Sequence, residues 1–454
     1  MEAIGSQQRC DCWSGGTPAK FVMRTVLQNL ASVIGGEAAV RAANFAAALF
    51  IARAFGGFAL GAYAASLAVV TVVVMIADNG LQTFVITELA GRPSERESII
   101  GEVYLYKTIL LAVVIALLGA VAGLLGLSTF LWGVGSWVAA RTILQSYSQL
   151  QMAALKSLSK TNAIGVIQVT HSLVLLAGIG TALFRHWTIF SLLAWLTACQ
   201  LFEFALTVFT LLGAGVRPSC PPTLRFWDSM RKSAPFGIAS GLANLIVRSD
   251  TVVLSTLVPL SVLGTFSAPN SVLLIVYVAA WLVGSVLLPE MVRLSATEEG
   301  LRHYFRKWTR LLILTSLPAA VIAFLAAPKF ILLLFGASFE RSGAPASIMA
   351  LACPFILLNS VYTNFAIALN RRAVFTGLYA GMAVVALGLN LVLGRAFGPI
   401  GIADAIVIRE AGMLAGFWIL MSRKPSQARQ SGSPVSSLSD VRVSEKPNLS
   451  SSLA

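Results

Sequence analysis

Charged and amide side chains recur at helical spacing inside stretches that are otherwise apolar. Glu37, Arg41 and Asn44 are spaced by four and three residues within the apolar run 27–52. Residues three or four apart share one face of an α-helix, so this spacing predicts a polar stripe. A charged side chain at the centre of a bilayer costs about 2.5 to 3.5 kcal/mol on insertion scales, and such residues face protein, water or substrate. We therefore expect Arg41 to be a functional residue.

Similar polar stripes occur in other apolar runs. Arg141 and Gln145 share a face in the run 130–152, and Asn244 and Arg248 do so in the run 235–257. These faces cannot point at lipid, so we expect them to converge on an interior cavity with a positive centre. The planar, permanently charged guanidinium suits diphosphate oxygens, which predicts an anionic cargo. The expected cavity residues are Arg41, Arg141, Arg248, Asn44, Asn244, Gln145 and Arg409.

Acidic residues within the apolar runs are candidates for proton or sodium coupling, namely Glu37, Asp78 and Asp250. Each has an alternative interpretation. Glu37 precedes Arg41 by four residues, the favoured order for an intrahelical ion pair, so the two could simply neutralise each other. Asp78 belongs to an Asp-Asn-Gly cluster that is more typical of a helix end. Asp250 faces away from Arg248 and is expected to pair with a neighbouring helix.

Composition places the chain in the membrane. The 454 residues are 57% hydrophobic and 11% charged, and the mean hydropathy is +0.81. Soluble domains carry about 25% charged residues. Spanning helices need about 20 apolar residues each, which predicts an all-α polytopic membrane protein of about twelve helices. The apolar runs are 27–52, 58–80, 103–125, 130–152, 162–184, 188–212, 235–257, 264–288, 308–327, 345–369, 374–395 and 400–421.

Loop charges predict the orientation. One set of alternate loops carries Arg53, Arg185, Lys329, Arg341 and Arg395, and the other set carries most of the remaining loop Lys and Arg residues. The positive-inside rule then places both termini in the cytoplasm and the chain in the inner membrane. The same rule explains the net charge of +14, so no nucleic-acid partner is expected. The basic loop from Arg217 to Lys232 could also meet anionic headgroups of membrane lipid.

An internal repeat predicts two six-helix halves. Leu60-Gly61-Ala62-Tyr63-Ala64-Ala65 and Leu263-Gly264-Thr265-Phe266-Ser267-Ala268 share the pattern Leu-Gly-x-aromatic-x-Ala, and each follows a helix with Val-Arg at mid-span. Repeats are a common plan for transporters. The expected units are a cytoplasmic arm 1–26, the halves 27–212 and 235–421, a basic cytoplasmic linker 213–234 and a disordered cytoplasmic tail 422–454.

Signals for catalysis are weak. The segment from Gly101 to Thr108 resembles a P-loop but has Tyr106 where glycine is required, and it leads into an apolar run. Cys10-Asp11-Cys12 is too isolated to predict a metal site. Membrane enzymes of glycan assembly usually need sizeable loops, and the predicted loops are short. We expect no catalytic residue, metal or cofactor, and a protein that is not an enzyme.

Several motifs together resemble those of bacterial polysaccharide-unit flippases (Wzx-like, polysaccharide transport family) of the multidrug/oligosaccharidyl-lipid/polysaccharide (MOP) exporter superfamily. The resemblance spans about residues 27–421. It rests on Arg53-Ala54-Phe55-Gly56, Leu60-Gly61-Ala62-Tyr63-Ala64, Ala77-Asp78-Asn79-Gly80-Leu81, Glu88-Leu89-Ala90, Leu334-Phe335-Gly336 and Phe397-Gly398-Pro399-Ile400-Gly401.

This resemblance implies a MATE/MOP-like, V-shaped bundle of the two six-helix halves. It also implies a transporter that flips an undecaprenyl-diphosphate-linked oligosaccharide from the cytoplasmic to the periplasmic leaflet by alternating access. The product would be an exopolysaccharide, an O-antigen or a capsule, with a polymerase and a co-polymerase as partners. Two alternatives stay open. One is a MATE-type drug/cation antiporter of the same superfamily, which would need acids rather than arginines in its cavity. The other is a membrane-embedded enzyme of glycan assembly.

Overall fold

The computed structural model describes residues 18–78, 80–92, 95–124, 126, 128–217, 219, 226–295, 297–369 and 372–422. Within these residues every long element is a helix. The helices are α1 (Pro18–Asp78), α2 (Leu81–Gly91), α3 (Arg96–Leu124), α4 (Thr129–Ser157), α5 (Thr161–Arg185), α6 (Ile189–Gly213), α7 (Phe226–Leu257), α8 (Leu260–Leu294), α9 (Glu298–Phe335), the short 3-10 helix η2 (Ala337–Ser342), α10 (Gly343–Ala368), α11 (Arg372–Phe397) and α12 (Pro399–Ser422).

The helix α1 contains two of the predicted spans. Gly56 interrupts it with φ 78° and ψ −175°, a conformation that residues with a side chain rarely adopt. With the two parts of α1 counted separately, twelve long helical segments result, each overlapping one predicted apolar run. The all-α, polytopic prediction is therefore confirmed.

The helices differ from the prediction mainly at their ends. α2 was not expected, and it begins after Gly80, where a positive φ of 73° turns the chain beyond Asp78. α1 begins at Pro18, inside the expected arm 1–26, and α7 begins at Phe226, inside the expected linker 213–234. Helices continue past their apolar cores because polar residues extend a helix into the interface. The remainder of the arm, residues 218 and 220–225 of the linker, and the tail beyond Ser422 lie outside the described residues.

Eight stretches of the described residues are long and apolar enough to cross a membrane, and one of them, Ser32–Ile86, contains both parts of α1. α4 is not among them, and it carries polar residues such as Arg141, Gln145 and Gln151 along its length. Large apolar side chains are widely exposed, for example Phe184 at 86% and Leu333 at 73%. A lipid-facing surface has this composition, so the chain is a multi-pass membrane protein.

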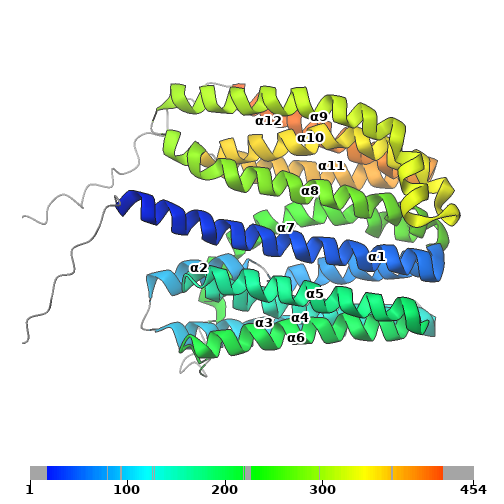
Figure 1. Ribbon diagram of the computed structural model, residues 1–454, viewed down its shortest axis with the longest axis horizontal. Helices are drawn as coiled ribbons and strands as arrows, with labels where there is room; N and C mark the ends of the chain where they lie inside the picture. The colour runs from blue at the N-terminus through cyan, green and yellow to red at the C-terminus, as the bar shows by residue number, and fades with distance from the viewer. Residues whose placement is uncertain are drawn as a thin grey trace, which may run out of the picture.

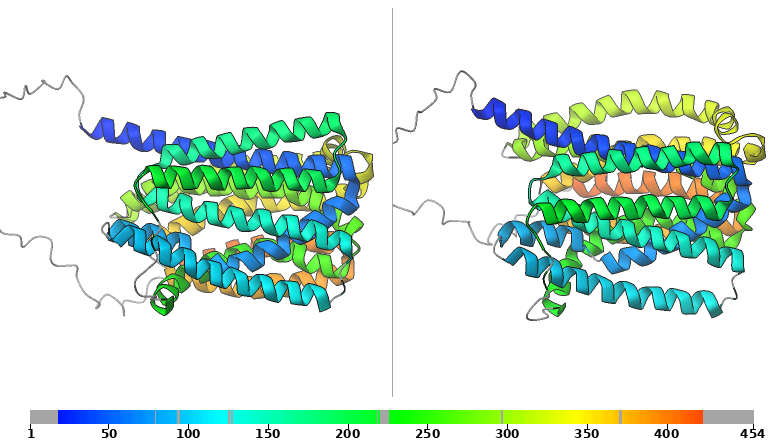
Figure 2. Two further views of the ribbon diagram at one scale, coloured as in Figure 1. Left: turned by 90° about the horizontal axis from the view of Figure 1, so that it is seen from below. Right: turned by 60° about the horizontal axis from the view of Figure 1, so that its bottom comes forward.

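The helices form two groups on either side of α1. Figure 1 shows α2–α6 on one side of α1 and α8–α12 on the other, and Figure 2 shows the long helices running nearly parallel in further views. α1 packs on α4 and α5 of the first group and on α7 and α8 of the second. The core of the first part of the chain includes Ala43, Ala47 and Leu196. α1 is therefore the element that joins the two groups.

The repeated Leu-Gly motifs lie against each other where α1 crosses α8. A Cβ atom on Gly61 would lie 1.8 Å from the carbonyl oxygen of Leu260, and one on Gly264 would lie 1.8 Å from that of Gly57. Only glycine permits this approach. The two copies of the motif thus form one contact between the two groups of helices, close to the Gly56 break.

A second contact at the same end of the bundle involves Arg53. Its Nε donates to the carbonyl oxygen of Leu334 at 2.6 Å and its Nη2 donates to that of Leu333 at 2.5 Å. These carbonyls belong to the last turn of α9, where backbone oxygens lack helical partners and the helix dipole favours a cation. Arg53 therefore links α1 to α9 across the two groups.

The glycine crossing yields a stability prediction. Gly264→Leu should push α8 away from Gly57 and cost about 1–3 kcal/mol or more, because overpacking a tight contact is destabilising. The measurement is the thermal unfolding temperature of the purified protein in detergent. The matched control is Gly180→Leu, because a Cβ there meets nothing within 4 Å. Equal unfolding temperatures for the two variants would contradict the prediction.

Candidate functional site

The polar face of α1 has the predicted arrangement. The Arg41 Nε atom lies 3.7 Å from the Glu37 Oε2 atom, and the two side chains are 53% and 28% exposed. Gln168 of α5 donates from Nε2 to Glu37 Oε1 at 3.0 Å. Glu37 is therefore held by two groups, whereas the guanidinium of Arg41 keeps much of its surface open.

Arg141 joins α4 to both parts of α1. It is 7% exposed, donates from Nη1 to Tyr63 Oη at 2.8 Å and donates from Nη2 to Asn44 Oδ1. Its buried Nε has no hydrogen-bond partner among the described residues. Tyr63 and Asn44 are both neutral, so among the described residues Arg141 is held in place by hydrogen bonds and not by an ion pair.

Arg248 brings a third positive charge from α7. It is half-buried, and its charge interacts electrostatically with Arg41 of α1. The structure brings Arg41, Asn44, Arg141 and Arg248 together where α1, α4 and α7 meet, and we refer to these four residues as the arginine cluster.

Two other predicted residues flank the arginine cluster. Asn244 lies one turn before Arg248 on α7 and is exposed, and Gln145 lies one turn after Arg141 on α4 and is half-buried. Helical spacing keeps each on the same face as its arginine. They extend the polar surface of the cluster along both helices.

Arg409 lies in a different set of contacts. It is 2% exposed, and its Nη1 donates to Asp250 Oδ1 at 2.6 Å and to the Ile246 carbonyl oxygen at 3.1 Å. Its Nη2 donates to Tyr277 Oη at 2.9 Å and lies 3.3 Å from Glu410 Oε1. The guanidinium is thereby fully engaged, which separates Arg409 from the other three arginines.

The carboxylates around Arg409 are satisfied as well. Asn390 donates to Asp250 Oδ1 at 2.9 Å, Asn359 donates to Glu410 Oε2 at 2.8 Å, and Tyr277 donates to Glu410 Oε1 at 2.7 Å. Asp250 pairs with a neighbouring helix, as its position on α7 predicts. Each carboxylate thus has both a cationic and a neutral partner, and we refer to the set as the fixed ion cluster of the second group of helices.

Asp78 forms a third cluster that sequence reasoning missed. Lys107 Nζ lies 2.6 Å from Asp78 Oδ1, donates to the Ser146 carbonyl oxygen at 2.8 Å, and is fully buried. Ser146 Oγ also donates to Asp78 Oδ1 at 2.7 Å. The sequence predicts no role for Lys107 beyond its place in the near-P-loop from Gly101 to Thr108. Its position inside the apolar run 103–125 is the feature that could have identified it as a buried lysine.

Two further groups that the predicted site did not include are Tyr63 and a buried pair, His171 and Glu203, 3.0 Å apart at Nδ1 and Oε2. Tyr63 could have been found, because it is the aromatic residue of the repeated motif. The pairing of His171 with Glu203 joins two different helices and left no local pattern in the sequence.

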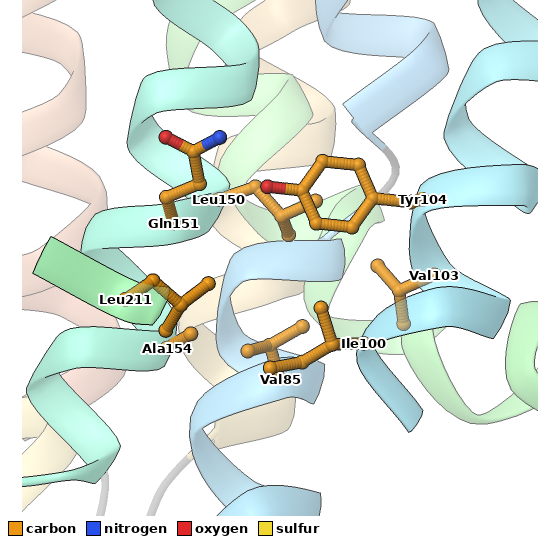
Figure 3. A pocket seen from close by; sticks show the side chains of 8 residues that line it. All are labelled: Val85, Ile100, Val103, Tyr104, Leu150, Gln151, Ala154 and Leu211. Atoms are coloured by element: carbon orange, nitrogen blue, oxygen red, sulfur yellow. The ribbon is translucent and has the colours of Figure 1, made fainter. Parts of the chain in front are cut away.

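A small pocket between α2, α3, α4 and α6 is a poor candidate for the functional site (Figure 3). Its lining residues are Val85, Ile100, Val103, Tyr104, Leu150, Gln151, Ala154 and Leu211. None of the eight carries a charge at neutral pH, so nothing in the lining would attract an ionic cargo. The arginine cluster remains the stronger candidate.

Comparison with known protein families identifies the family of the chain. Residues 50–343 match the family described as polysaccharide biosynthesis protein, which is more than half of the 454 residues. The chain belongs to the polysaccharide biosynthesis protein family. A comparison with curated protein sequences found no match.

Solved structures show that this polysaccharide biosynthesis protein has the MOP superfamily fold. It is similar to the lipid II flippase MurJ in an inward closed conformation, with TM-score 0.72 and 14% identity over 86% of this chain and 87% of that one. An inward-facing MATE transporter of the MOP superfamily gives TM-score 0.68 and 13% identity over 84% and 94% of the two chains. A MOP superfamily transporter from Pyrococcus furiosus gives TM-score 0.62 and 13% identity over 88% and 95%.

The fixed ion cluster yields a second stability prediction. Arg409→Met should leave Asp250 and Glu410 buried without their cation, which costs about 3–5 kcal/mol. Lower yield and a lower unfolding temperature of the purified protein are expected. Arg395→Met is the control, because Arg395 lies exposed in the last turn of α11. Wild-type stability of Arg409→Met would show that the cluster does not support the fold.

Proposed function

We propose that this protein moves an undecaprenyl-diphosphate-linked oligosaccharide repeat unit from the cytoplasmic to the periplasmic leaflet of the inner membrane. The product serves synthesis of an exopolysaccharide, an O-antigen or a capsule. The observation that carries the proposal is the arginine cluster. Three guanidinium groups from α1, α4 and α7 lie where the two groups of helices meet, and bidentate guanidinium groups are well suited to a diphosphate.

The charge balance supports an anionic cargo. Among the described residues, Glu37 is the carboxylate that forms an ion pair with the cluster, and its Oε2 atom lies 3.7 Å from the Nε atom of Arg41. Arg141 contacts neutral partners, and Arg248 meets the charge of Arg41. Like charges held together in a low-dielectric site repel one another and attract a counter-ion. The two phosphates of the lipid carrier would supply that counter-charge.

Alternating access follows from the contacts between the groups. The glycine crossing and the bonds of Arg53 both lie at the end of the bundle that the loop charges place in the periplasm. Both would have to open for release on that side. The same orientation puts both termini in the cytoplasm. The structures of MurJ and of a MATE transporter are described as inward closed and inward-facing, and this fold likeness agrees with closure at the outer end.

The MATE-type antiporter is the second candidate, because several MATE transporters share the fold. A cation exporter needs acids that are free to bind cargo. Asp250 and Glu410 are instead held by Arg409, and Asp78 is held by Lys107. We therefore favour the lipid-linked anion, with a polymerase and a co-polymerase acting on the flipped unit. No enzymatic step is part of the proposal.

The decisive variants are Arg41→Gln and Arg248→Gln. Each should lower flipping of a fluorescent undecaprenyl diphosphate in reconstituted vesicles by roughly 10-fold to 100-fold, the usual weight of a hydrogen bond to a charged group. In cells, surface polysaccharide should be lost at unchanged membrane abundance. Arg310→Gln, on the exposed side of α9, is the control. Normal flipping with both cluster arginines replaced would refute the proposal. Efflux of a cationic dye would instead support the antiporter.

A further inference from the structure

A buried histidine and a buried glutamate form a pair beside the arginine cluster. His171 of α5 is 1% exposed and Glu203 of α6 is 6% exposed. His171 Nδ1 lies 3.0 Å from Glu203 Oε2 and 3.1 Å from the carbonyl oxygen of Cys199. Both atoms are therefore within hydrogen-bond reach of the same ring nitrogen.

The surroundings assign one proton of this pair. A carbonyl oxygen can only accept a hydrogen bond, and the carboxylate of Glu203 is also an acceptor when it is ionised. The hydrogen of the neutral ring therefore resides on Nδ1, shared between the two oxygens. Nε2 is then the ring atom that remains able to take up a second proton.

This pair differs from the other buried acids. Asp250 and Glu410 contact Arg409, and Asp78 contacts Lys107. Each of those three acids therefore has a lysine or an arginine as its direct partner. Histidine is the side chain whose own charge changes near neutral pH. The net charge of the His171–Glu203 pair can therefore switch between −1 and zero.

The charges that face the pair come from every neighbouring helix. Arg141 of α4 interacts electrostatically with His171, with Glu203 and with the thiol group of Cys199. Glu37 of α1 interacts with Glu203. Arg41 lies one turn beyond Glu37 at 3.7 Å. Within the described residues these are the charged and titratable groups around the pair, and Arg141 belongs to both the pair and the arginine cluster.

A polar route connects the pair to the more exposed surface. Gln168 lies one turn before His171 on α5 and donates to Glu37 Oε1 at 3.0 Å. Glu37 is 28% exposed. Glu37, which interacts electrostatically with Glu203, is thus a partly exposed acid near the pair, and acids of this kind form proton relays in membrane proteins.

We propose that His171 and Glu203 form a proton-binding site whose occupancy sets how strongly Arg141 attracts the diphosphate. The inference rests on the proposed function. The pair takes up one proton from a hydronium ion, either on the Glu203 carboxylate or on His171 Nε2, and no covalent bond between heavy atoms changes. The charge of the pair rises from −1 to zero, so less negative charge offsets Arg141.

Binding of the proton and binding of the diphosphate then strengthen each other. Protonation of the pair leaves Arg141 less neutralised and strengthens its hold on a diphosphate. By linkage, a bound diphosphate offsets Arg141 and strengthens proton binding at the pair by the same factor. A proton would accompany the cargo through the site and cancel part of its charge.

The test uses nuclear magnetic resonance of the full-length protein in nanodiscs with labelled histidine rings. The chain has three histidines, and the exposed His186 and His303 serve as internal references. His171→Gln assigns the third signal. We expect the His171 ring signals to report the uptake of one proton by the pair within about pH 5–8. Undecaprenyl diphosphate should raise the midpoint by about one pH unit, whereas Glu203→Gln should lower it, because the ring loses its anionic partner.

The controls define what would overturn the inference. Arg395→Gln should leave the His171 titration unchanged, since Arg395 lies exposed at the far end of α11. A His171 signal that is constant over this range, or one that ignores both Glu203→Gln and undecaprenyl diphosphate, would show a purely structural pair. Arg141→Gln should abolish the effect of undecaprenyl diphosphate while the ring still titrates.

A transport assay tests the proton site independently of the titration. In vesicles with a fluorescent undecaprenyl diphosphate, the flipping rate of the wild type should change over about pH 5–8. In Glu203→Gln the change in rate over the same range should be smaller by about 10-fold or more. A wild-type pH profile in Glu203→Gln would refute the proton site while leaving the function intact. Absence of flipping by the wild type would refute the function, and the lipid-free titration of His171 would still decide on the proton site.

Discussion

The balance of charges inside the bilayer determines the rest of this structure. Each ionised side chain in the spanning region needs a counter-charge, a set of donors or access to water, because its desolvation cost is otherwise prohibitive. The second group of helices meets this need internally, with Arg409 bonded to Asp250, Tyr277 and Glu410. At the interface between the groups, Arg41 has Glu37 as its counter-charge, whereas Arg141 contacts the neutral groups Tyr63 and Asn44. This difference underlies our proposal that the interface binds an anion.

The broken helix α1 makes that interface possible. Asn44 precedes the break at Gly56 and Tyr63 follows it, yet both accept hydrogen bonds from Arg141. A straight helix would carry these two residues far apart along its axis. The reversal at Gly56 therefore lets a single element supply both neutral partners of one buried cation.

The sequence predicts the parts of this protein that follow local periodicity. The apolar runs predict the membrane spans. The spacing of four and three residues between Glu37, Arg41 and Asn44 predicts that they share a polar helix face. Both predictions depend on helix geometry alone. Pairings between distant helices left no such trace. No sequence pattern near Arg409 indicates that Asp250 and Asn390 lie close to it. We expected Arg409 to share a surface with Arg41, but helix packing buries Arg409 elsewhere, and packing cannot be read from local spacing. The pairing of His171 with Glu203 was not predicted for the same reason.

The contact of Gly61 and Gly264 with the facing backbones has a consequence for how such a duplicated protein changes over time. The two glycines occupy matching positions of an internal repeat, and each lies against the backbone that carries the other copy. Two copies of a repeat are normally free to diverge, since each folds around its own core. Here a larger residue in one copy would displace the backbone of the other. At this point the two halves can only evolve as a pair.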